Sequence, residues 1–181
     1  MPVGQRYVIG LDENGKSSVV MTGLANVQER ENAFWRATLW KTRETPVDNT
    51  VPGDRSLDGG ALRAPFPNGM LVRALEIWPD PDSATLRQRA AEVNNMVGHN
   101  TEITEAEQRR HPTMHHTDTL DVGIVLRGEI YCLLDEEEIL LKPFDTVVVQ
   151  GVSHGWSNRG TEPCLLFGLL LDAQPRATSD S

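Results

Sequence analysis

The imidazole and carboxylate groups most able to act together lie in residues 114–164. In an extended segment every second side chain shares one face, so His115 and Asp121 lie on the same side. A strand approaching from the segment around His154 would bring a second imidazole against them. Two imidazoles and one carboxylate are the set expected for Fe(II), and the same set would hold Mn, Ni or Zn. The pattern predicts a divalent transition metal at His115, Asp121 and His154.

Other roles for these residues stay open. Asp121 is one methylene shorter than Glu and can act as a base instead of a ligand; with no metal at all, His154 and Asp121 would be the acid and base directly. Asp118 is a further candidate catalytic base if the segment is not a regular strand. In a purely structural interpretation, His154 bonds to backbone and Asp121 caps a turn. His116 and Asp118 then face solvent, whereas in the functional interpretation they hydrogen-bond the ligands.

Several other polar groups are less specific. His99 and His111 lie in a polar segment that favours a solvated loop or helix. The acidic run 135–138 lacks the glycine and spaced oxygens of a calcium loop and is typical of a hairpin turn. Arg73 and Arg127 can pair with an anionic substrate or extend into solvent.

The elements that must position these residues are mostly short strands. Strands are predicted at residues 6–11, 17–21, 33–40 and 70–78. The pair Asn14-Gly15 favours a hairpin turn between the first two, and a Pro-rich and Gly-rich loop over 43–69 precedes the last. Apolar residues at helical spacing predict one helix over 83–97, with Asp82 or Ser83 before it and Gly98 beyond its end. Regular short strands from 118 to 171 favour an all-β sandwich or barrel.

Composition limits the classes of molecule that the chain is expected to bind. The chain has 181 residues with 17 Lys and Arg against 26 Asp and Glu, a formal charge of −9, which makes nucleic acid and anionic membrane poor partners. The first 15 residues do not resemble a signal peptide, and Cys132 and Cys164 lie in apolar runs typical of buried reduced thiols. A cytoplasmic location is expected. A phosphate-binding glycine loop and a serine nucleophile elbow are both missing from the sequence.

The segment 114–164 resembles the cupin superfamily. The family's second motif, Gly, two residues, His, three residues, Asn, is present from Gly151 to Asn158. Its Pro-Gly-Asp turn is replaced by Pro143-Phe144-Asp145. Counting back from Gly128, the acidic position of the first motif falls on Asp121 and its two His positions on His115 and Thr117. The first motif matches a subgroup of small bacterial and fungal cupins with the pattern His-x-Thr-Asp-Thr-x-Asp.

The resemblance implies a cupin double-stranded β-helix, a jelly-roll barrel, over residues 70–172. An N-terminal β extension, 1–69, would pack on it, and a frayed tail, 173–181, would follow. Such proteins often pair through N-terminal strands, so a homodimer is expected.

A small-molecule enzyme is the leading functional hypothesis: a lyase of dehydratase type, or an isomerase, acting on a carbonyl-bearing metabolite such as a polyketide-like intermediate. Metal or His/Asp acid-base chemistry would serve it. An Fe(II)-dependent dioxygenase is the alternative, because the same ligand set leaves positions for substrate and O₂. A non-catalytic binding module is a third possibility, since Thr117 stands in a His position.

Overall fold

Two antiparallel β-sheets form the body of the protein. The computed structural model describes residues 4–97 and 104–176. The larger sheet has six strands in the order β3-β4-β5-β11-β6-β9, and the smaller has three in the order β10-β7-β8. The strands of the larger sheet are β3 (Asn26–Arg30), β4 (Phe34–Lys41), β5 (Met70–Ile77), β6 (Thr119–Arg127), β9 (Thr146–Gln150) and β11 (Cys164–Asp172). Those of the smaller sheet are β7 (Ile130–Leu133), β8 (Glu138–Leu141) and β10 (Gly155–Ser157). The predicted all-β jelly-roll class is confirmed.

The main core lies between the two sheets. Alternate apolar residues of β6 and β11, among them Val125 and Leu166, pack against Ile130 and Leu141 of the smaller sheet. This arrangement follows from strand geometry, because residues two apart share a face and only one face of each sheet meets the other. Burial of the inner face therefore fixes the register of the strands that carry the candidate site.

Both cysteines belong to this core. Cys132 of β7 and Cys164 of β11 are free thiols with no exposed surface. Burial raises the pKa of Cys132 to about 11 and that of Cys164 to about 12, so both thiols stay protonated at neutral pH. The prediction of buried reduced thiols is confirmed for the structure described here.

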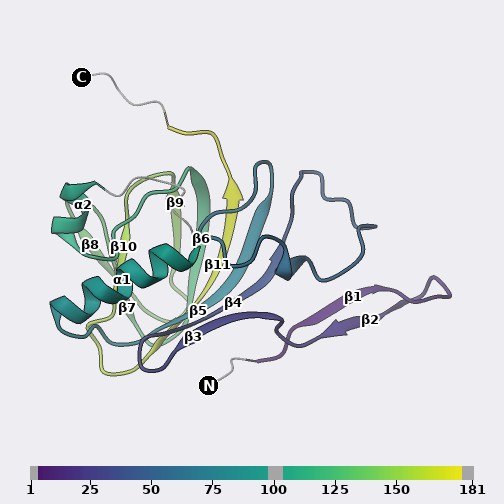
Figure 1. Cartoon of the computed structure of the whole chain (residues 1–181), viewed down its shortest axis with the longest axis horizontal. Helices are drawn as coiled ribbons and strands as arrows, with labels where there is room; N and C mark the ends of the chain where they lie inside the picture. The colour runs from purple at the N-terminus through teal and green to yellow at the C-terminus, as the bar shows by residue number, and fades with distance from the viewer. Residues whose placement is uncertain (1–3, 98–103, 177–181) are drawn as a thin grey trace.

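The N-terminal residues form a hairpin and two further strands of the larger sheet. Strands β1 (Tyr7–Leu11) and β2 (Ser17–Thr22) pair around the predicted turn, where Gly15 has a φ of 73°. Figure 1 shows this hairpin extending away from the sheets. The sequence pattern did not predict β3, which is mostly polar. Strand β4, which belongs to the predicted N-terminal extension, pairs with β5 in the same sheet. The domain boundary at residue 69 stays a prediction.

Two helices accompany the sheets. Helix α1 (Ser83–Val97) matches the predicted range, and Figure 1 shows it lying across the strands. A second short helix, α2 (Glu105–Arg110), begins at a capping box in which Thr104 and Glu107 bond each other's backbone N–H. The sequence left open whether the polar segment before His111 is a loop or a helix, and part of it is this helix. Gly98 and His99 lie outside the described residues. The loop 43–69 holds one 3₁₀ turn, Arg55–Leu57. Within the described ranges, neither helix is long and apolar enough to cross a membrane.

Candidate active site

His115 and His154 face each other across a pair of chain segments. The backbone N–H of each donates to the carbonyl of the other, at 2.8 Å and 3.0 Å, so the two residues form an isolated β-bridge. Their ring centroids are 4.4 Å apart and the rings are tilted by 52°. Both side chains are buried. The structure therefore brings together the two histidines that the sequence placed in the site.

Each imidazole is held in one tautomer by its own segment. The Nδ1–H of His115 donates to the carbonyl of Thr113 at 2.9 Å, and the Nδ1–H of His154 donates to the carbonyl of Val152 at 3.0 Å. A carbonyl can only accept, so Nδ1 carries the proton and Nε2 carries the lone pair. Among the described residues neither Nε2 has a hydrogen-bond partner. Both Nε2 atoms are free to bind a proton or a metal.

The surroundings keep both rings neutral. Burial lowers the pKa of His115 well below its usual range, and the neighbouring His154 and Arg63 lower it further. Burial also lowers the pKa of His154, opposed by the carbonyl of Val152 and the carboxylate of Asp121. A neutral imidazole with a free Nε2 is the form that accepts a proton.

The two carboxylates considered as bases lie in different places. Asp121 of β6 lines a small cavity of about 40 Å³ together with His154, and its Oδ1 is buried without a hydrogen-bond partner among the described residues. Asp118 precedes β6, and its side chain is 43% exposed and lies 3.5 Å from Nε2 of His116. It lines a separate pocket of about 230 Å³ that neither His115 nor His154 lines. Asp121 is thus placed beside the imidazole pair and Asp118 is not.

The three-ligand metal set is only partly assembled. In the parts of the chain that the structure describes, no three His, Cys, Asp or Glu side chains gather closely enough to hold a metal ion. Thr117, which stands in a His position of the family motif, has its hydroxyl bonded to that of Thr119 at 2.7 Å. His115 and His154 could supply two nitrogen ligands, but the observed side chains do not complete a three-donor site with Asp121. The metal stays a prediction.

A larger cavity opens beside His115. Its volume is about 170 Å³, and most of its wall is apolar. The apolar wall comes from β4, β5 and α1, and includes Phe34, Leu75, Ile77, Val93, Met96 and Val97. Trp156 of β10 and Arg73 of β5 line both this cavity and the smaller one that holds Asp121. The two cavities are therefore neighbours, with the histidine pair where they meet.

Four arginines also line the larger cavity: Arg36, Arg63 and Arg73, which come from β4, the loop before β5 and β5, and Arg89 of α1. The sequence analysis considered only Arg73, together with Arg127. Arg127 points outward and pairs with the buried carboxylate of Glu76 at 2.5 Å. The missed signal is the position of Arg36, an arginine in the middle of the apolar strand pattern of residues 33–40.

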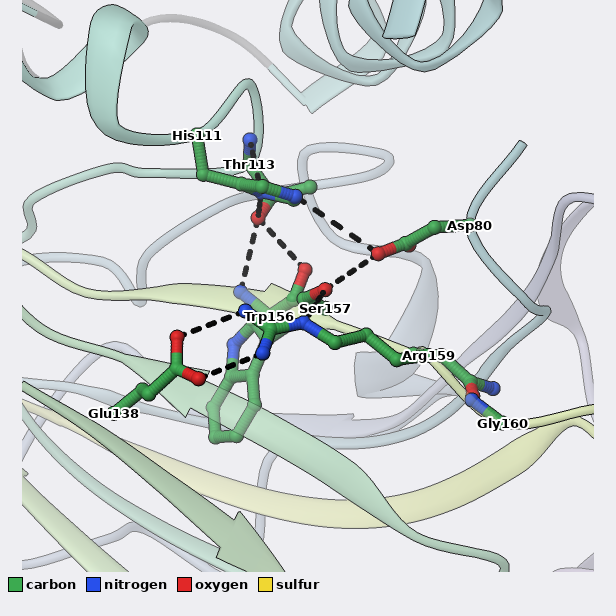
Figure 2. Close-up of polar contacts among 9 residues, drawn as sticks. Asp80, His111, Thr113, Glu138, Trp156, Ser157, Arg159 and Gly160 are labelled. Carbon is green, nitrogen blue, oxygen red and sulfur yellow. Dashed lines mark hydrogen bonds and ion pairs between the residues drawn. The ribbon is translucent and has the colours of Figure 1, made fainter. Parts of the chain in front are cut away.

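A hydrogen-bond network fixes the segment that carries His115. The hydroxyl of Thr113 donates to the carbonyl of Trp156 at 2.7 Å and accepts from its N–H at 3.0 Å (Figure 2). The same hydroxyl lies 2.8 Å from Nδ1 of His111. Since the carbonyl of Thr113 holds the ring of His115, these bonds tie that ring to β10. His111 thus has a supporting position and is partly buried.

The network continues along β10 to the surface. The hydroxyl of Ser157 donates to Asp80 at 2.5 Å, and Nε2 of His111 lies 3.8 Å from the same carboxylate oxygen. Arg159 pairs with Glu138 through two contacts of 2.6 and 2.8 Å, as Figure 2 shows. Glu138 ends the acidic run 135–138, which forms the predicted turn between β7 and β8.

Comparison with known proteins shows what this chain is similar to. Residues 101–171 match the family model described as Cupin domain. The chain is 25% identical over 185 aligned residues to the cupin-domain-containing oxidoreductase virC of Hypocrea virens, an alignment that covers 97% of this chain and 79% of virC. It is 47% identical over 125 residues to the phomopsin biosynthesis cluster protein C' of Diaporthe leptostromiformis, covering 66% of this chain and 51% of that protein.

Among solved structures, KdgF from a Halomonas species is similar with a TM-score of 0.45 and 12% identity, over 83% of this chain and 90% of that chain. The chain thus spans about half the length of the phomopsin cluster protein and about four fifths of virC. The family model covers the strands from β6 to β11 and both candidate histidines. The match identifies residues 101–171 of this chain as a cupin domain.

Proposed function

We propose that the chain is a small-molecule enzyme that moves a proton next to a carbonyl group, in a dehydration or an isomerisation. One observation carries the proposal: two buried, neutral imidazoles face each other with both Nε2 atoms free, beside an apolar cavity. A buried neutral imidazole has the lone pair that such a reaction needs. The phomopsin relative's name, which places that protein in a biosynthetic cluster, supports a small-molecule substrate.

In this mechanism His154 is the base. Its Nε2 takes the proton from the carbon next to the carbonyl, and the carboxylate of Asp121 stabilises the imidazolium that forms. Arg73, which lines both cavities, stabilises the negative charge that develops on the carbonyl oxygen. The imidazolium then returns the proton to a departing hydroxyl, which leaves as water, or to another carbon of the same molecule. Proton and charge balance in both outcomes.

The test is proton exchange in D₂O. Purified protein is incubated with a panel of β-hydroxy ketones and β,γ-unsaturated ketones, and loss of the proton next to the carbonyl is followed by ¹H NMR. We expect faster exchange than in buffer with at least one compound, and a rate about 100-fold lower with His154→Gln. His116→Gln is the matched control, because that half-exposed histidine lies outside both cavities. Exchange at the buffer rate across the panel, or an unchanged rate in His154→Gln, would contradict the proposal.

An Fe(II)-dependent oxidoreductase is the second candidate. It is favoured by the name of virC, a cupin-domain-containing oxidoreductase whose alignment covers most of this chain. Elemental analysis of untagged protein and oxygen uptake after loading with Fe(II) distinguish the candidates. Stoichiometric iron with substrate-dependent oxygen uptake would support the oxidoreductase, whereas exchange that persists under argon with a chelator supports the proton-transfer enzyme.

A further inference from the structure

The geometry points to an anion-binding site in the larger cavity, formed by Arg36, Arg63 and Arg73, that takes the carboxylate of an otherwise apolar small molecule. This inference deepens the proposed function by naming the class of substrate, and it rests on that function only for the reaction that follows binding. Arg89 of α1 is a fourth arginine in the lining of this cavity, and its Nε is buried without a hydrogen-bond partner among the described residues. The site itself follows from the placement of the first three guanidinium groups, their missing acidic partners and the walls around them.

The three arginines come from elements that meet at the cavity. In the register of β4 and β5, Arg36 lies opposite Leu75 and Arg73 lies opposite Thr38, and both arginines line the larger cavity. Arg63 comes from the loop before β5, and its backbone N–H donates to the carbonyl of Val97 at the end of α1 at 3.2 Å. Strand pairing and helix packing thus gather three cations in one place.

None of the three has an acidic partner in the described ranges. Eight other arginines form ion pairs with Asp or Glu, whereas these three bond only to neutral groups. Arg36 donates to the carbonyl of Leu62, Arg63 to the side chain of Asn94, and Arg73 to the carbonyl of Arg63 at 3.2 Å.

Arg36 is the clearest case. Only 5% of the residue is exposed, and its Nε is buried with no hydrogen-bond partner among the described residues. A buried guanidinium with an unused donor is costly unless something supplies the missing acceptor. Because Arg36 lines the cavity, an anion bound there could provide that acceptor.

The charge balance of the cavity is positive. Burial and mutual repulsion lower the pKa of Arg36 well below its usual value and that of Arg63 to about 10. Burial also lowers the pKa of Arg73, opposed by the carboxylate of Asp121 in the smaller cavity. Asp80 also lines the cavity, but its carboxylate already accepts from the hydroxyl of Ser157 and lies near His111. A bound anion would relieve the repulsion and the desolvation cost together.

A carboxylate fits these groups better than a phosphate. A guanidinium fork pairs with two oxygens of a carboxylate or of a phosphate, so the choice between the two anions depends on the rest of the cavity wall. Helix α1 contributes residues only from Leu86 onward to the cavity, so its first-turn N–H groups do not line it. The remaining wall is largely apolar and suits a hydrocarbon or aromatic body. With the carboxylate on the arginines, that body extends toward His115, which lines the same cavity.

Isothermal titration calorimetry with benzoate tests the inference. Benzamide has the same shape without the charge, and inorganic phosphate is a second anion. We expect benzoate to bind, benzamide to bind at least 10-fold more weakly, and Arg36→Met and Arg63→Gln each to weaken benzoate at least 10-fold. Arg109→Gln is the matched control, since Arg109 is an exposed arginine of α2 outside this cavity.

A second readout separates binding from folding. If Arg36 is kept for binding, Arg36→Met should fold with a melting temperature equal to or above that of the unmodified chain, because a repelled buried charge is removed. Equal affinity for benzoate and benzamide, benzoate binding unchanged in both cavity variants, or a lower melting temperature for Arg36→Met without loss of benzoate affinity would overturn the site. Tighter binding of phosphate than of benzoate would overturn the choice of carboxylate.

The inference and the proposed function can fail separately. His154→Gln should bind benzoate as the unmodified chain does, because His154 does not line the larger cavity. Benzoate binding with no proton exchange would overturn only the proposed reaction. Exchange on neutral ketones without benzoate binding would overturn only the anion site.

Discussion

At the scale of single residues, the chemistry of the site depends on what each polar atom contacts. Sequence alone does not distinguish the side chains of His115 and His154 from those of the other histidines. In the structure, their Nδ1–H groups donate to the carbonyls of Thr113 and Val152. Burial then favours the neutral form, so Nε2 keeps its lone pair free at neutral pH, and the fold rather than water sets its direction. The contacts of the two aspartates differ in the same way: Asp121 lines the small cavity with His154, whereas Asp118 is 43% exposed and lies near His116.

Substitution of the two aspartates tests this distinction. Asp121→Asn removes the charge that stabilises the imidazolium of His154 while keeping the size of the side chain, and we expect exchange in D₂O to fall about 10- to 100-fold. Asp118→Asn should change the rate less than about twofold, because Asp118 lies away from both cavities. Equal effects of the two substitutions would show that the assignment of Asp121 is wrong.

At the scale of elements, strands decide which side chains enter the cavity. Arg36 and Phe34 of β4 line the cavity, whereas Trp35 and Ala37 pack with Ala74 in a separate cluster. The alternation of a strand therefore places cations and apolar groups on one face and a second small core on the other.

The turn between β8 and β9 offers a stability test. Phe144 stands where the family has Gly, has a φ of 74° and is 82% exposed. A left-handed backbone is costly for a residue with a Cβ, and this side chain gains little from burial. Phe144→Gly should raise the free energy of unfolding by about 0.5–1 kcal/mol in urea titrations. Phe144→Ala is the control, since it shortens the side chain but keeps the Cβ; an equal gain there would assign the effect to the exposed ring.

At the scale of the whole molecule, the largely buried side chain of Arg6 connects the N-terminal hairpin to the sheets. Arg6, just before β1, donates to the carboxylate of Asp54 at 2.8 and 2.5 Å and to the carbonyl of Leu39 in β4 at 3.1 Å. The hairpin exposes Tyr7, Ile9 and Leu11. The contact joins three regions that are distant in sequence, and the homodimer stays a prediction.

This ion pair should make stability depend on acid. The hydrogen bonds from Arg6 lower the pKa of Asp54 from 3.8 to about 2. A carboxyl whose pKa is lowered on folding stabilises the folded chain above its unfolded pKa, and this contribution is lost as the pH falls from about 4 toward 2. Asp54→Asn should therefore cost about 1–2 kcal/mol in urea unfolding at pH 7, allowing for partial exposure.

The pH series is the control for that prediction. The difference between Asp54→Asn and the unmodified chain should shrink as the pH is lowered from 4 to 2, because the native carboxyl becomes protonated. A difference that stays constant over this range would show that packing, rather than the charge of Asp54, supports the contact.

The sequence alone determined the features whose residue patterns lie within one continuous stretch of the chain. Alternation and turn residues predicted the β1–β2 hairpin, the strands over 33–40 and 70–78 and the helix over 83–97, and motif spacing pointed to His115 and His154. It missed β3, whose polar residues give no strand pattern.

Only the tertiary structure decided which distant groups meet. The histidine bridge, the separation of Asp121 from Asp118 and the gathering of Arg36, Arg63 and Arg73 depend on strand register and helix packing. The physical reason is that periodicity assigns a side chain to a face, while pairing between strands far apart in sequence decides what that face contacts.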